Sequence, residues 1–458
     1  MGFARAQRAV TTRTKLGLPP GPRGFSFTWE LLRSPAAWLD FLVRWDAEYG
    51  DVVFFRFLGA PVCLIGDPSG IEQVLVADHQ NFTKSMDYRA LSRVLGRGLL
   101  TSEGDLWKQQ RRLIQPAFCR ERVQSYAGFM TSYARRMLDD WQDGEVRDIH
   151  GDMMRVTLEI AARSLFSAEI GGDAGTIGRA LTVVMRDMLN LANFSFLPGW
   201  LPLPGTGGFR RALRDLDEIV DGLIRDRRAN GHHPGDLLDM LLEARDEDGA
   251  GMPDRQLRDE VMTLLLAGHE TTANTLTWTL YLLGRYLEAQ SRLEAEVDEV
   301  LGGRVPEAAG LHQLPYLQTV LMESQRLYPP AWAIGRKAIK AFDVLGYRLP
   351  AGTNVMISQW ILHRNPRYYP DPERFDPDRW GEEAAGHRSL PKFTYLPFGA
   401  GPRVCIGAGL ALQEAALVLA TLIQRFRFSL ASPEPPEILP SVTLRPGNGL
   451  RMRVEKRG

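Results

Sequence analysis

The sequence predicts a mainly α-helical protein with a smaller β-rich region, and three stretches support this fold class. Residues 261–287 form the longest apolar stretch, and residues 406–426 form another that is rich in alanine and leucine, so both are predicted to be buried helices. Residues 51–67 contain two apolar runs on either side of Gly59 and Ala60, a pattern typical of a β-hairpin. We therefore expect a large helical core and a small sheet.

Composition excludes several classes of protein. The chain has 458 residues, of which 44% are hydrophobic, so it is long enough to bury a large core. Basic and acidic residues both number 55, which leaves none of the excess positive charge typical of nucleic-acid binding. The cysteines Cys63, Cys119 and Cys405 are too far apart for a disulfide framework, so a cytoplasmic location is expected. Charged and polar residues interrupt the longest apolar stretch, so no transmembrane anchor is expected.

The chain is expected to contain one domain. Residues 1–17 are predicted to be a basic, flexible N-terminal tail, and residues 18–458 show no internal repeat and no loop long enough to serve as a linker. Residues 193–209 predict an apolar loop. Such a loop either forms an interaction or ligand surface or folds its aromatic side chains back into the core.

Residues 396–412 combine glycines and prolines with Arg403 and Cys405, just before a predicted helix. The glycines and prolines predict a tight turn, and Cys405 then meets the unpaired N–H groups and the positive end of the helix, which favour a thiolate. A dinucleotide loop is excluded because no G-x-G-x-x-G register is complete, and a phosphate-type cysteine loop is excluded because Ala411 stands where an arginine is needed. No histidine or second cysteine is near enough for zinc. A lone thiolate beside a cation suits an iron ligand in a cofactor that bears carboxylates.

Residues 267–272, read as A-G-H-E-T-T, place polar groups inside an apolar helix. A glycine in mid-helix costs about 1 kcal/mol relative to alanine, and Glu270 adds a desolvation cost. Such conflicts concentrate at functional sites. Ala267, Gly268, Thr271, Asn274 and Thr275 share one helix face, which suits a flat ring beside a hydroxyl. The alternative is a packing glycine with a threonine bonded to its own helix.

Residues 398–407, F-G-A-G-P-R-V-C-I-G, resemble the haem-binding signature of the cytochrome P450 family at every fixed position. Three further family motifs occur in the expected order, W-x-x-x-R at 107–111, the acid–alcohol pair at 270–271 and E-x-x-R at 323–326. The resemblance covers nearly the whole chain, which is identified as a soluble bacterial-type member. It implies the cytochrome P450 fold, with haem b between the long central helix and the helix that follows the cysteine.

The resemblance also implies roles for individual residues around the cofactor. Cys405 is implied to be the axial ligand of the haem iron, with Phe398 packed beside its sulfur and Gly407 allowing close approach of the backbone. Ala267 and Gly268 are implied to lie against the ring. The implied contacts of the haem propionates are Trp107, Arg111, Arg336 and Arg403.

The remaining implied roles concern protons, structure and substrate. Thr271 is implied to hydrogen-bond dioxygen, and Glu270 to help bring protons in. Glu323 and Arg326 are implied to form a buried structural triad with Arg374 of the P-E-R-F motif. The residues implied to line the substrate pocket are Ala331, Trp332, Ala333 and Ile334. Residues 193–209 correspond in position to the family's substrate-entry lid, which touches membrane in some members.

The implied function is that of a monooxygenase that inserts one oxygen atom of O2 into an apolar small molecule, such as a fatty acid, terpenoid, steroid or polyketide. Electrons are expected from a separate ferredoxin or flavodoxin and its reductase, and the chain is expected to be a monomer. A basic surface is predicted to receive that partner, formed by Lys108, Arg112, Arg120, Arg122, Arg388 and Lys392. The alternatives are a haem-thiolate isomerase, dehydratase or peroxygenase, or a non-catalytic haem-binding protein. The acid–alcohol pair favours the monooxygenase.

Overall fold

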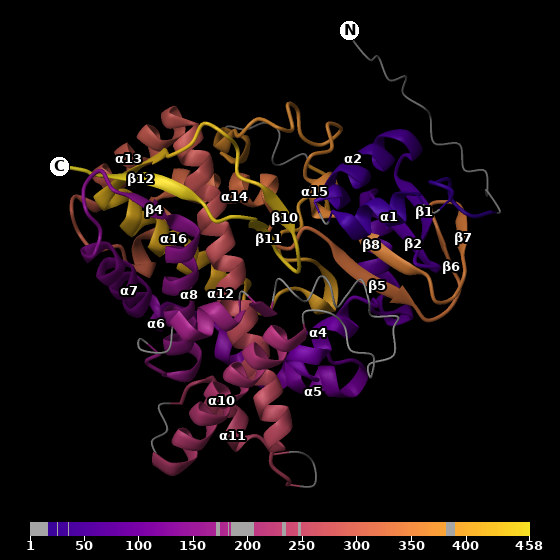
Figure 1. The fold of residues 1–458 in the computed structure, drawn as a ribbon, viewed down its shortest axis with the longest axis horizontal. Coiled ribbons are helices and arrows are strands. Elements are labelled where there is room, and N and C mark those ends of the chain that lie inside the picture. Colours follow the sequence, from indigo (N-terminus) through magenta and orange to yellow (C-terminus); the bar gives the residue numbers. More distant parts are fainter. Residues whose placement is uncertain are drawn as a thin grey trace.

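The computed structural model describes residues 17–458, except residues 25, 35, 171–174, 182, 185–205, 231–234, 246–248 and 382–389. Helices make up most of the molecule, and the strands form smaller sheets, of which the largest lies at one side of it (Figure 1). The predicted fold class is therefore confirmed. The predicted tail up to residue 16, most of the 193–209 loop and Arg388 lie outside the described residues.

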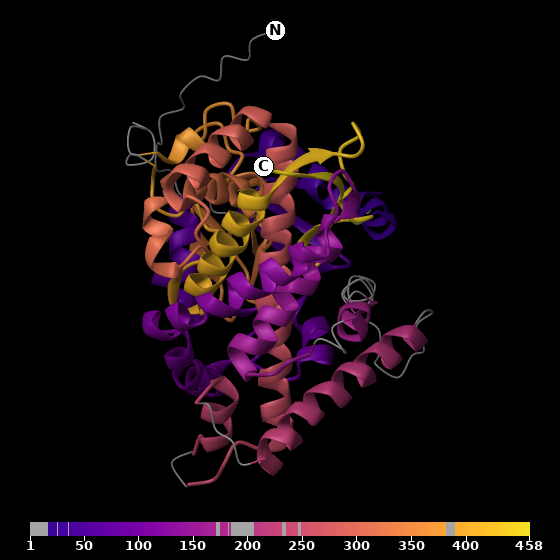
Figure 2. The same ribbon diagram turned by 90° about the vertical axis from the view of Figure 1, so that its left-hand side faces the viewer.

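The longest helix, α12 (Asp254–Arg285), runs through the middle of the molecule (Figures 1 and 2). It contains most of the predicted 261–287 helix, and its core residues are buried from Leu257 to Leu283. Most of its threonine hydroxyls donate to carbonyls of the same helix, as in the bond of 2.7 Å from Thr277 Oγ1 to the carbonyl of Ala273, whereas the buried hydroxyl of Thr263 has no partner among the described residues. α12 packs against several other helices, of which α8 and α16 matter most for the site.

The second predicted helix is α16 (Ala408–Arg425), which follows the cysteine and is buried along most of its length. The other helices are α1 (Ser26–Arg33), α2 (Ala37–Tyr49), α3 (Pro68–Glu72), α4 (Tyr88–Leu95), α5 (Gly104–Ile114), α6 (Arg120–Ser125), α7 (Ala127–Asp139), α8 (Ile149–Phe166), α10 (Thr206–Asn230), α11 (Leu237–Glu243), α13 (Leu287–Leu301), α14 (Pro315–Leu327) and α15 (Gln359–Leu362). Most of them pack with α12 and α16 in the largest hydrophobic core, while α1, α2, α3 and α15 contribute to two smaller cores.

Short turns of other helix types connect these elements. The π-helical turn is η1 (Gln73–Ala77), and the 3₁₀ turns are η2 (His79–Asn81), η3 (Gln115–Phe118), η4 (Ala308–Gln313), η5 (Pro377–Trp380) and η7 (Gly401–Arg403). Two of them bear on the site, because η7 lies in the loop before the cysteine and contacts η1. No helix among the described residues is both long and apolar enough to cross a membrane.

The main sheet has five strands in the order β1-β2-β8-β5-β3. They are β1 (Val52–Phe57), β2 (Ala60–Ile65), β3 (Phe82–Lys84), β5 (Ile334–Ala338) and β8 (Asn354–Ile357). The predicted hairpin is confirmed, because β1 and β2 pair antiparallel through a tight turn at Leu58 and Gly59, which have φ values of 50° and 81°. Strands β2 and β8 pair in parallel, and the other pairs are antiparallel.

Three smaller sheets complete the fold. The first joins β4 (Val146–Asp148), β12 (Arg451–Lys456) and β9 (Phe426–Leu430), in that order. The second pairs β6 (Phe342–Val344) with β7 (Tyr347–Leu349), and the third pairs β10 (Ile438–Pro440) with β11 (Leu444–Pro446). The β10–β11 hairpin is fixed to the central helix, since Trp278 Nε1 donates to the carbonyl of Leu444 at 2.9 Å.

Candidate functional site

The cysteine loop, residues 396–407, is held in one conformation by its own backbone and by its neighbours. The N–H of Cys405 donates to the carbonyl of Phe398 at 2.9 Å, which closes the loop. Gly401 has a φ of 72°, a left-handed conformation that glycine adopts without strain. A side chain at Gly401 would also collide with the carbonyl oxygen of Leu75. The glycine is therefore required both by the turn and by the close contact with η1.

The sulfur of Cys405 lies at the start of α16, and the cysteine is exposed. Desolvation by the surrounding protein raises the pKa of the Cys405 thiol. Two groups oppose this effect: the N–H of Gly407, which donates to the sulfur, and the nearby positive charge of Arg111. These two groups would stabilise a thiolate. The position of the cysteine at a turn-to-helix junction agrees with the sequence prediction.

Helix α5 brings two predicted residues to the cysteine loop. The guanidinium of Arg403 lies over the ring of Trp107, with 5.1 Å between its central carbon and the ring centre. Arg111 donates from Nη1 to the carbonyl of Val404 at 2.8 Å. Arg111 therefore contacts the backbone next to Cys405, and its role at a propionate remains a prediction.

A cluster of cations lies beside the loop. Strands β3 and β5 place Lys84 opposite Arg336, and both residues are close enough to Arg403 for their charges to influence one another. Arg403 forms a two-pronged ion pair with Glu103, of which the bond from Nη1 measures 2.8 Å. Glu103 also accepts a bond of 2.5 Å from the N–H of Lys84. The three cations Lys84, Arg336 and Arg403 therefore lie around a single carboxylate, that of Glu103.

Lys84 is the member of this cluster that sequence reasoning missed. Its ammonium group donates to the carbonyls of Leu99, at 3.1 Å, and Ser102, at 2.6 Å. Desolvation and the nearby charge of Arg403 lower its pKa to about 7. A single lysine before a polar loop carries no signal of this role. Its register opposite Arg336, which lies about 250 residues away, appears only once the strands pair.

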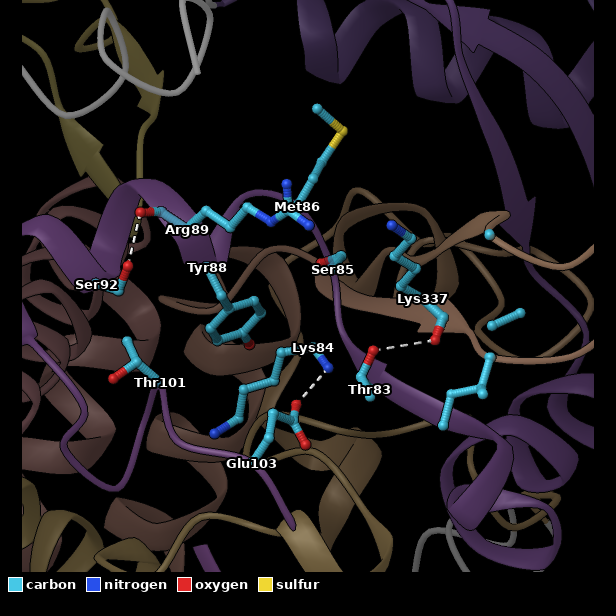
Figure 3. A pocket seen from close by; sticks show the side chains of 13 residues that line it. Thr83, Lys84, Ser85, Met86, Tyr88, Arg89, Ser92, Thr101, Glu103 and Lys337 are labelled. Atoms are coloured by element: carbon cyan, nitrogen blue, oxygen red, sulfur yellow. Dashed lines mark hydrogen bonds between the residues drawn. The ribbon is translucent and has the colours of Figure 1, made fainter. Parts of the chain in front are cut away.

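A cavity of about 520 Å³ opens next to this cluster, and Figure 3 shows Lys84 beside Glu103 within it. Its other lining residues are mostly polar, and several come from strands β3 and β5 or helix α4. They are Thr83, Ser85, Met86, Tyr88, Arg89, Ser92, Thr101, Lys337, Ala338, Ile339 and Gly352.

The central helix presents one accessible face. Between residues 259 and 283, only Ala267, Gly268 and Thr271 are not buried. They are three of the five residues predicted to form a platform for a flat ring, and the other two, Asn274 and Thr275, are buried. The hydroxyl of Thr271 donates to the carbonyl of Ala267 at 3.0 Å, so the threonine is bonded to its own helix, as the alternative interpretation stated. Thr271 therefore makes this hydrogen bond within the helix and still lies on the accessible face.

Glu270 faces away from solvent and toward the β10–β11 hairpin. Its carboxylate accepts a hydrogen bond of 2.6 Å from the hydroxyl of Thr443, which lies in the turn between the two strands. Desolvation raises the pKa of Glu270, and the bond from Thr443 and the charge of Arg445 oppose that effect. A carboxyl group in this setting takes up a proton more readily than one in water, as a proton-delivering group must near neutral pH.

Glu323 and Arg326 are fully buried on α14 and form an ion pair at 2.8 Å. The second cationic side chain at Glu323 is Arg379, whose Nε donates to it at 3.3 Å. Arg374 contributes only its backbone carbonyl, which accepts from Arg326 at 3.0 Å, while its side chain is exposed. The prediction of Arg374 as the third side chain is therefore wrong, because Arg379 on η5 faces Glu323.

The four residues predicted to line the substrate pocket are half-buried. The indole nitrogen of Trp332 donates to the carbonyl of Ser441 at 2.8 Å, next to Thr443. Ile334 approaches the cysteine loop, because its side chain would lie 3.5 Å from a carbon added to Gly399. The segment therefore lies between the β10–β11 hairpin and the cysteine loop, and its contact with substrate remains a prediction.

A cavity of about 670 Å³ lies along α5 and η3, on the surface near Cys405. Three of its lining residues, Lys108, Arg111 and Arg112, are basic. The others are Trp107, Gln115, Pro116, Phe118 and Cys119. Of the further residues predicted to form a basic surface, Arg120 and Lys392 are exposed, and Arg122 is half-buried and bonded to the carbonyl of Gly235.

Comparison with known proteins identifies one family. The family model described as Cytochrome P450 matches residues 19–451. The chain is 38% identical to cyclooctatin synthase of Streptomyces melanosporofaciens, over 92% of this chain and 92% of that protein. It is also 38% identical to cyclooctat-9-en-7-ol 5-monooxygenase of the same organism, over 93% and 91%, respectively. It is 33% identical to pentalenene oxygenase of Streptomyces avermitilis, over 88% of each chain.

Proposed function

Because the chain belongs to the cytochrome P450 family, we propose that it inserts one oxygen atom of O2 into a terpenoid-like molecule, using electrons from a separate redox protein. The family binds haem b, and the chain is a cytochrome P450 monooxygenase, an oxidoreductase. The proposal adds the substrate class, the electron source and the residues that act. The observation that carries it is the exposed Cys405, which receives the N–H of Gly407 at the start of α16.

The described residues fit haem b in three respects. Cys405 is exposed, so its sulfur could serve as the protein ligand of the haem iron. Arg336 and Arg403, with Lys84 partly protonated near pH 7, outweigh the single negative charge of Glu103 and leave positive charge for the propionates of haem. The accessible face of α12 carries only small residues and one hydroxyl, so a flat ring can lie against it. These residues are proposed to hold the cofactor.

The protein contributes binding, orientation and protons to the reaction. Bound haem b supplies the iron chemistry that activates dioxygen. Gly407 and Arg111 would favour the thiolate form of the Cys405 sulfur and so oppose the desolvation of the thiol. On the other side of the site, the Thr271 hydroxyl can turn from Ala267 to donate a hydrogen bond. Glu270, with its raised pKa, can store a proton for delivery.

The terpenoid class is proposed from the relatives and from the pocket segment. Two similar proteins bear names that refer to the oxidation of cyclooctat-9-en-7-ol and pentalenene. Residues 331–334 are apolar and half-buried, as a pocket for a mostly hydrocarbon skeleton requires. A polycyclic terpenoid offers a rigid apolar body with few polar groups, so burial of its surface would supply most of the binding energy.

The cofactor assignment is tested by spectroscopy. The purified, dithionite-reduced protein should form a carbonyl adduct with a thiolate-type spectrum, and Cys405→Ala should lose that spectrum. Cys119→Ala provides a matched control, because Cys119 is another exposed cysteine and lies in the neighbouring cavity. An unchanged spectrum in Cys405→Ala would refute the ligand assignment.

The substrate class is tested by titration. Polycyclic terpenoid hydrocarbons and alcohols should perturb the haem absorption at lower concentration than fatty acids with the same number of carbon atoms. NAD(P)H-dependent oxygen uptake with a surrogate redox chain should then yield an oxygenated terpenoid. Tighter binding of the fatty acids would contradict the substrate class, and product formation without O2 would favour an isomerase or dehydratase.

A further inference from the structure

Three residues of the central helix, spaced four apart, point toward the β10–β11 hairpin. Glu270, Asn274 and Trp278 each interact with the segment that contains Thr443 and Leu444. Residues at this spacing lie on one face of an α-helix. These three residues are buried, whereas the neighbouring Ala267, Gly268 and Thr271 on the same helix are not. The hairpin therefore receives the acid of the acid–alcohol pair, while the alcohol lies on the accessible face.

The hydroxyl of Thr443 has its orientation fixed by two neighbours. The amide nitrogen of Asn274 donates to its oxygen at 3.1 Å, and the hydroxyl in turn donates to the carboxylate of Glu270 at 2.6 Å. All three residues are buried. An amide NH2 group can only donate, so the hydroxyl proton must point toward Glu270. The hydrogen bonds therefore run from Asn274 through Thr443 to Glu270, whose carboxylate is the final acceptor.

The turn that carries Thr443 is itself rigid and is linked to the pocket segment. Ser441 donates to the carbonyl of Thr443 from both its N–H and its hydroxyl, at 3.0 Å each. Trp332 donates to the carbonyl of Ser441 at 2.8 Å, and the N–H of Leu444 donates to the carbonyl of Pro330 at 2.9 Å. The position of the Thr443 hydroxyl is therefore set by the hairpin and by the segment proposed to contact substrate.

We infer that Thr443 is a positioning residue for Glu270, holding its carboxylate as an ionised acceptor so that it can take up and release protons during turnover. The inference rests on the proposed function. Hydroxylation follows the balance RH + O2 + 2e⁻ + 2H⁺ → ROH + H2O, in which the electrons come from the external redox protein. A carboxyl group that supplies these protons must regain each proton that it releases. A carboxyl group that stays protonated throughout cannot release a proton and therefore cannot act in this cycle.

The physical reason lies in the cost of burying a charge. Desolvation alone favours the neutral form of Glu270. The groups that oppose it are the Thr443 hydroxyl and the positive charge of Arg445 on β11. The other titratable group near this cluster is His150 at the start of α8, whose pKa is lowered by burial and is raised in part by Asp148 and Asn274. Without the Thr443 hydroxyl, only the charge of Arg445 would oppose the desolvation that raises the pKa of Glu270.

The test replaces the hydroxyl with a methyl group of similar size. In Thr443→Val, infrared spectroscopy at neutral pH should show a larger carbonyl band from a protonated carboxyl group than in the wild type. The band should disappear in Thr443→Val/Glu270→Gln, and Thr443→Ser, which retains a hydroxyl, should restore the wild-type spectrum. Thr277→Val is the matched control, because Thr277 is also buried but bonds only within α12.

Turnover supplies the second measurement. Product formed per NAD(P)H consumed should fall about tenfold in Thr443→Val, with the lost electrons recovered as hydrogen peroxide or water. This is less than the roughly 10²–10⁴-fold that general acid–base catalysis contributes, because the variant retains Glu270. Thr443→Ser and Thr277→Val should keep the wild-type ratio. An unchanged carbonyl band in Thr443→Val would overturn the inference, and so would an unchanged ratio.

Failure of the proposed function would look different. The infrared measurement requires no substrate, electron donor or turnover, so it tests the Thr443–Glu270 contact in the purified protein alone. A wild-type protein that shows the thiolate-type carbonyl spectrum but oxidises no terpenoid would refute the substrate class and leave the contact standing. A thiolate-type spectrum with product, but no effect of Thr443→Val, would refute only the role of Thr443.

Discussion

At the scale of single residues, the buried carboxylate of Glu323 shows how many partners an internal charge requires. Besides Arg326 and Arg379, it accepts bonds from the indole nitrogen of Trp380 at 2.8 Å and the N–H of Asp376 at 3.1 Å. Arg326 in turn donates to three backbone carbonyls between residues 363 and 374. The pair thus fixes the chain that leads into the cysteine loop.

The first prediction concerns this pair and its third side chain. Arg326→Met should lower the free energy of unfolding by about 3–5 kcal/mol, because it leaves Glu323 as an unpaired buried charge. Arg379→Ala should cost about 1–3 kcal/mol, since it removes one charged hydrogen-bond donor from Glu323. Denaturant unfolding monitored by far-UV circular dichroism measures both changes.

Arg374→Ala is the control for that prediction. The side chain of Arg374 is exposed, and only its backbone carbonyl is used, so the change should stay within about 0.5 kcal/mol of the wild type. An Arg374→Ala variant as unstable as Arg379→Ala would restore the original assignment of the triad.

This triad also shows what a sequence can specify. The spacing of Glu323 and Arg326 puts them on one helix face, so the pair could be predicted. Arg374 and Arg379 lie in a segment without helical or strand periodicity over most of its length. Nothing in that segment indicates which arginine faces inward. The same limit applies to Thr443, whose contact with Glu270 joins residues 173 positions apart.

At the scale of elements, pairs of strands and loop–helix contacts assemble the site. The loop at residues 96–101 is fixed to the central helix, because the N–H of Leu99 donates to Glu260 at 2.9 Å and the N–H of Arg97 donates to Asp259 at 2.8 Å. The hairpin at 51–67 and the two long helices were predictable from local periodicity. The pairing of β3 with β5, which creates the cation cluster, was not.

The second prediction is a pH dependence at this contact. Desolvation raises the pKa of Glu260 from 4.5 to about 7. The folded protein therefore binds more protons than the unfolded chain between these values, so this contribution to stability is fully present below pH 4.5 and is lost as the pH rises to about 7. Relative to Glu260→Gln, the wild type should lose at most about 1.4 kcal/mol per pH unit in that window.

Denaturant unfolding of both proteins at several pH values between 4 and 8 measures this difference. Glu299→Gln serves as the matched control, because Glu299 is an exposed glutamate on α13. Parallel stability curves for the wild type and Glu260→Gln would contradict the prediction.

At the scale of the whole molecule, charge is balanced overall but not evenly distributed. Acidic and basic residues are equal in number, yet the cavity along α5 near Cys405 carries three basic residues. Such a surface attracts an acidic redox protein and accelerates its association. The exposed residues of this surface come from α5, the start of α6 and the segment before the cysteine loop, which are separate in sequence.

The third prediction follows from that distribution. Lys108→Glu and Arg112→Glu should each slow reduction of the haem by an acidic ferredoxin or flavodoxin, and the wild-type rate should fall as ionic strength rises. Lys456→Glu on β12 is the control, since β12 lies on the opposite side of the molecule from α5 (Figure 1). Stopped-flow absorption measures the rates. Equal rates in all variants, or a rate insensitive to salt, would argue against docking at this surface.

The middle strand of the β4-β12-β9 sheet sets a lower limit on when the protein can finish folding. Asp148 on β4 pairs with Arg451 on β12, so β4 has no strand partner until about 300 further residues have been synthesised, which takes roughly 15–60 s at the usual rate of translation. During that interval the edge of β4 and the start of α8 are exposed to other nascent chains. Chaperone binding to the unfinished polypeptide should therefore be concentrated at this segment.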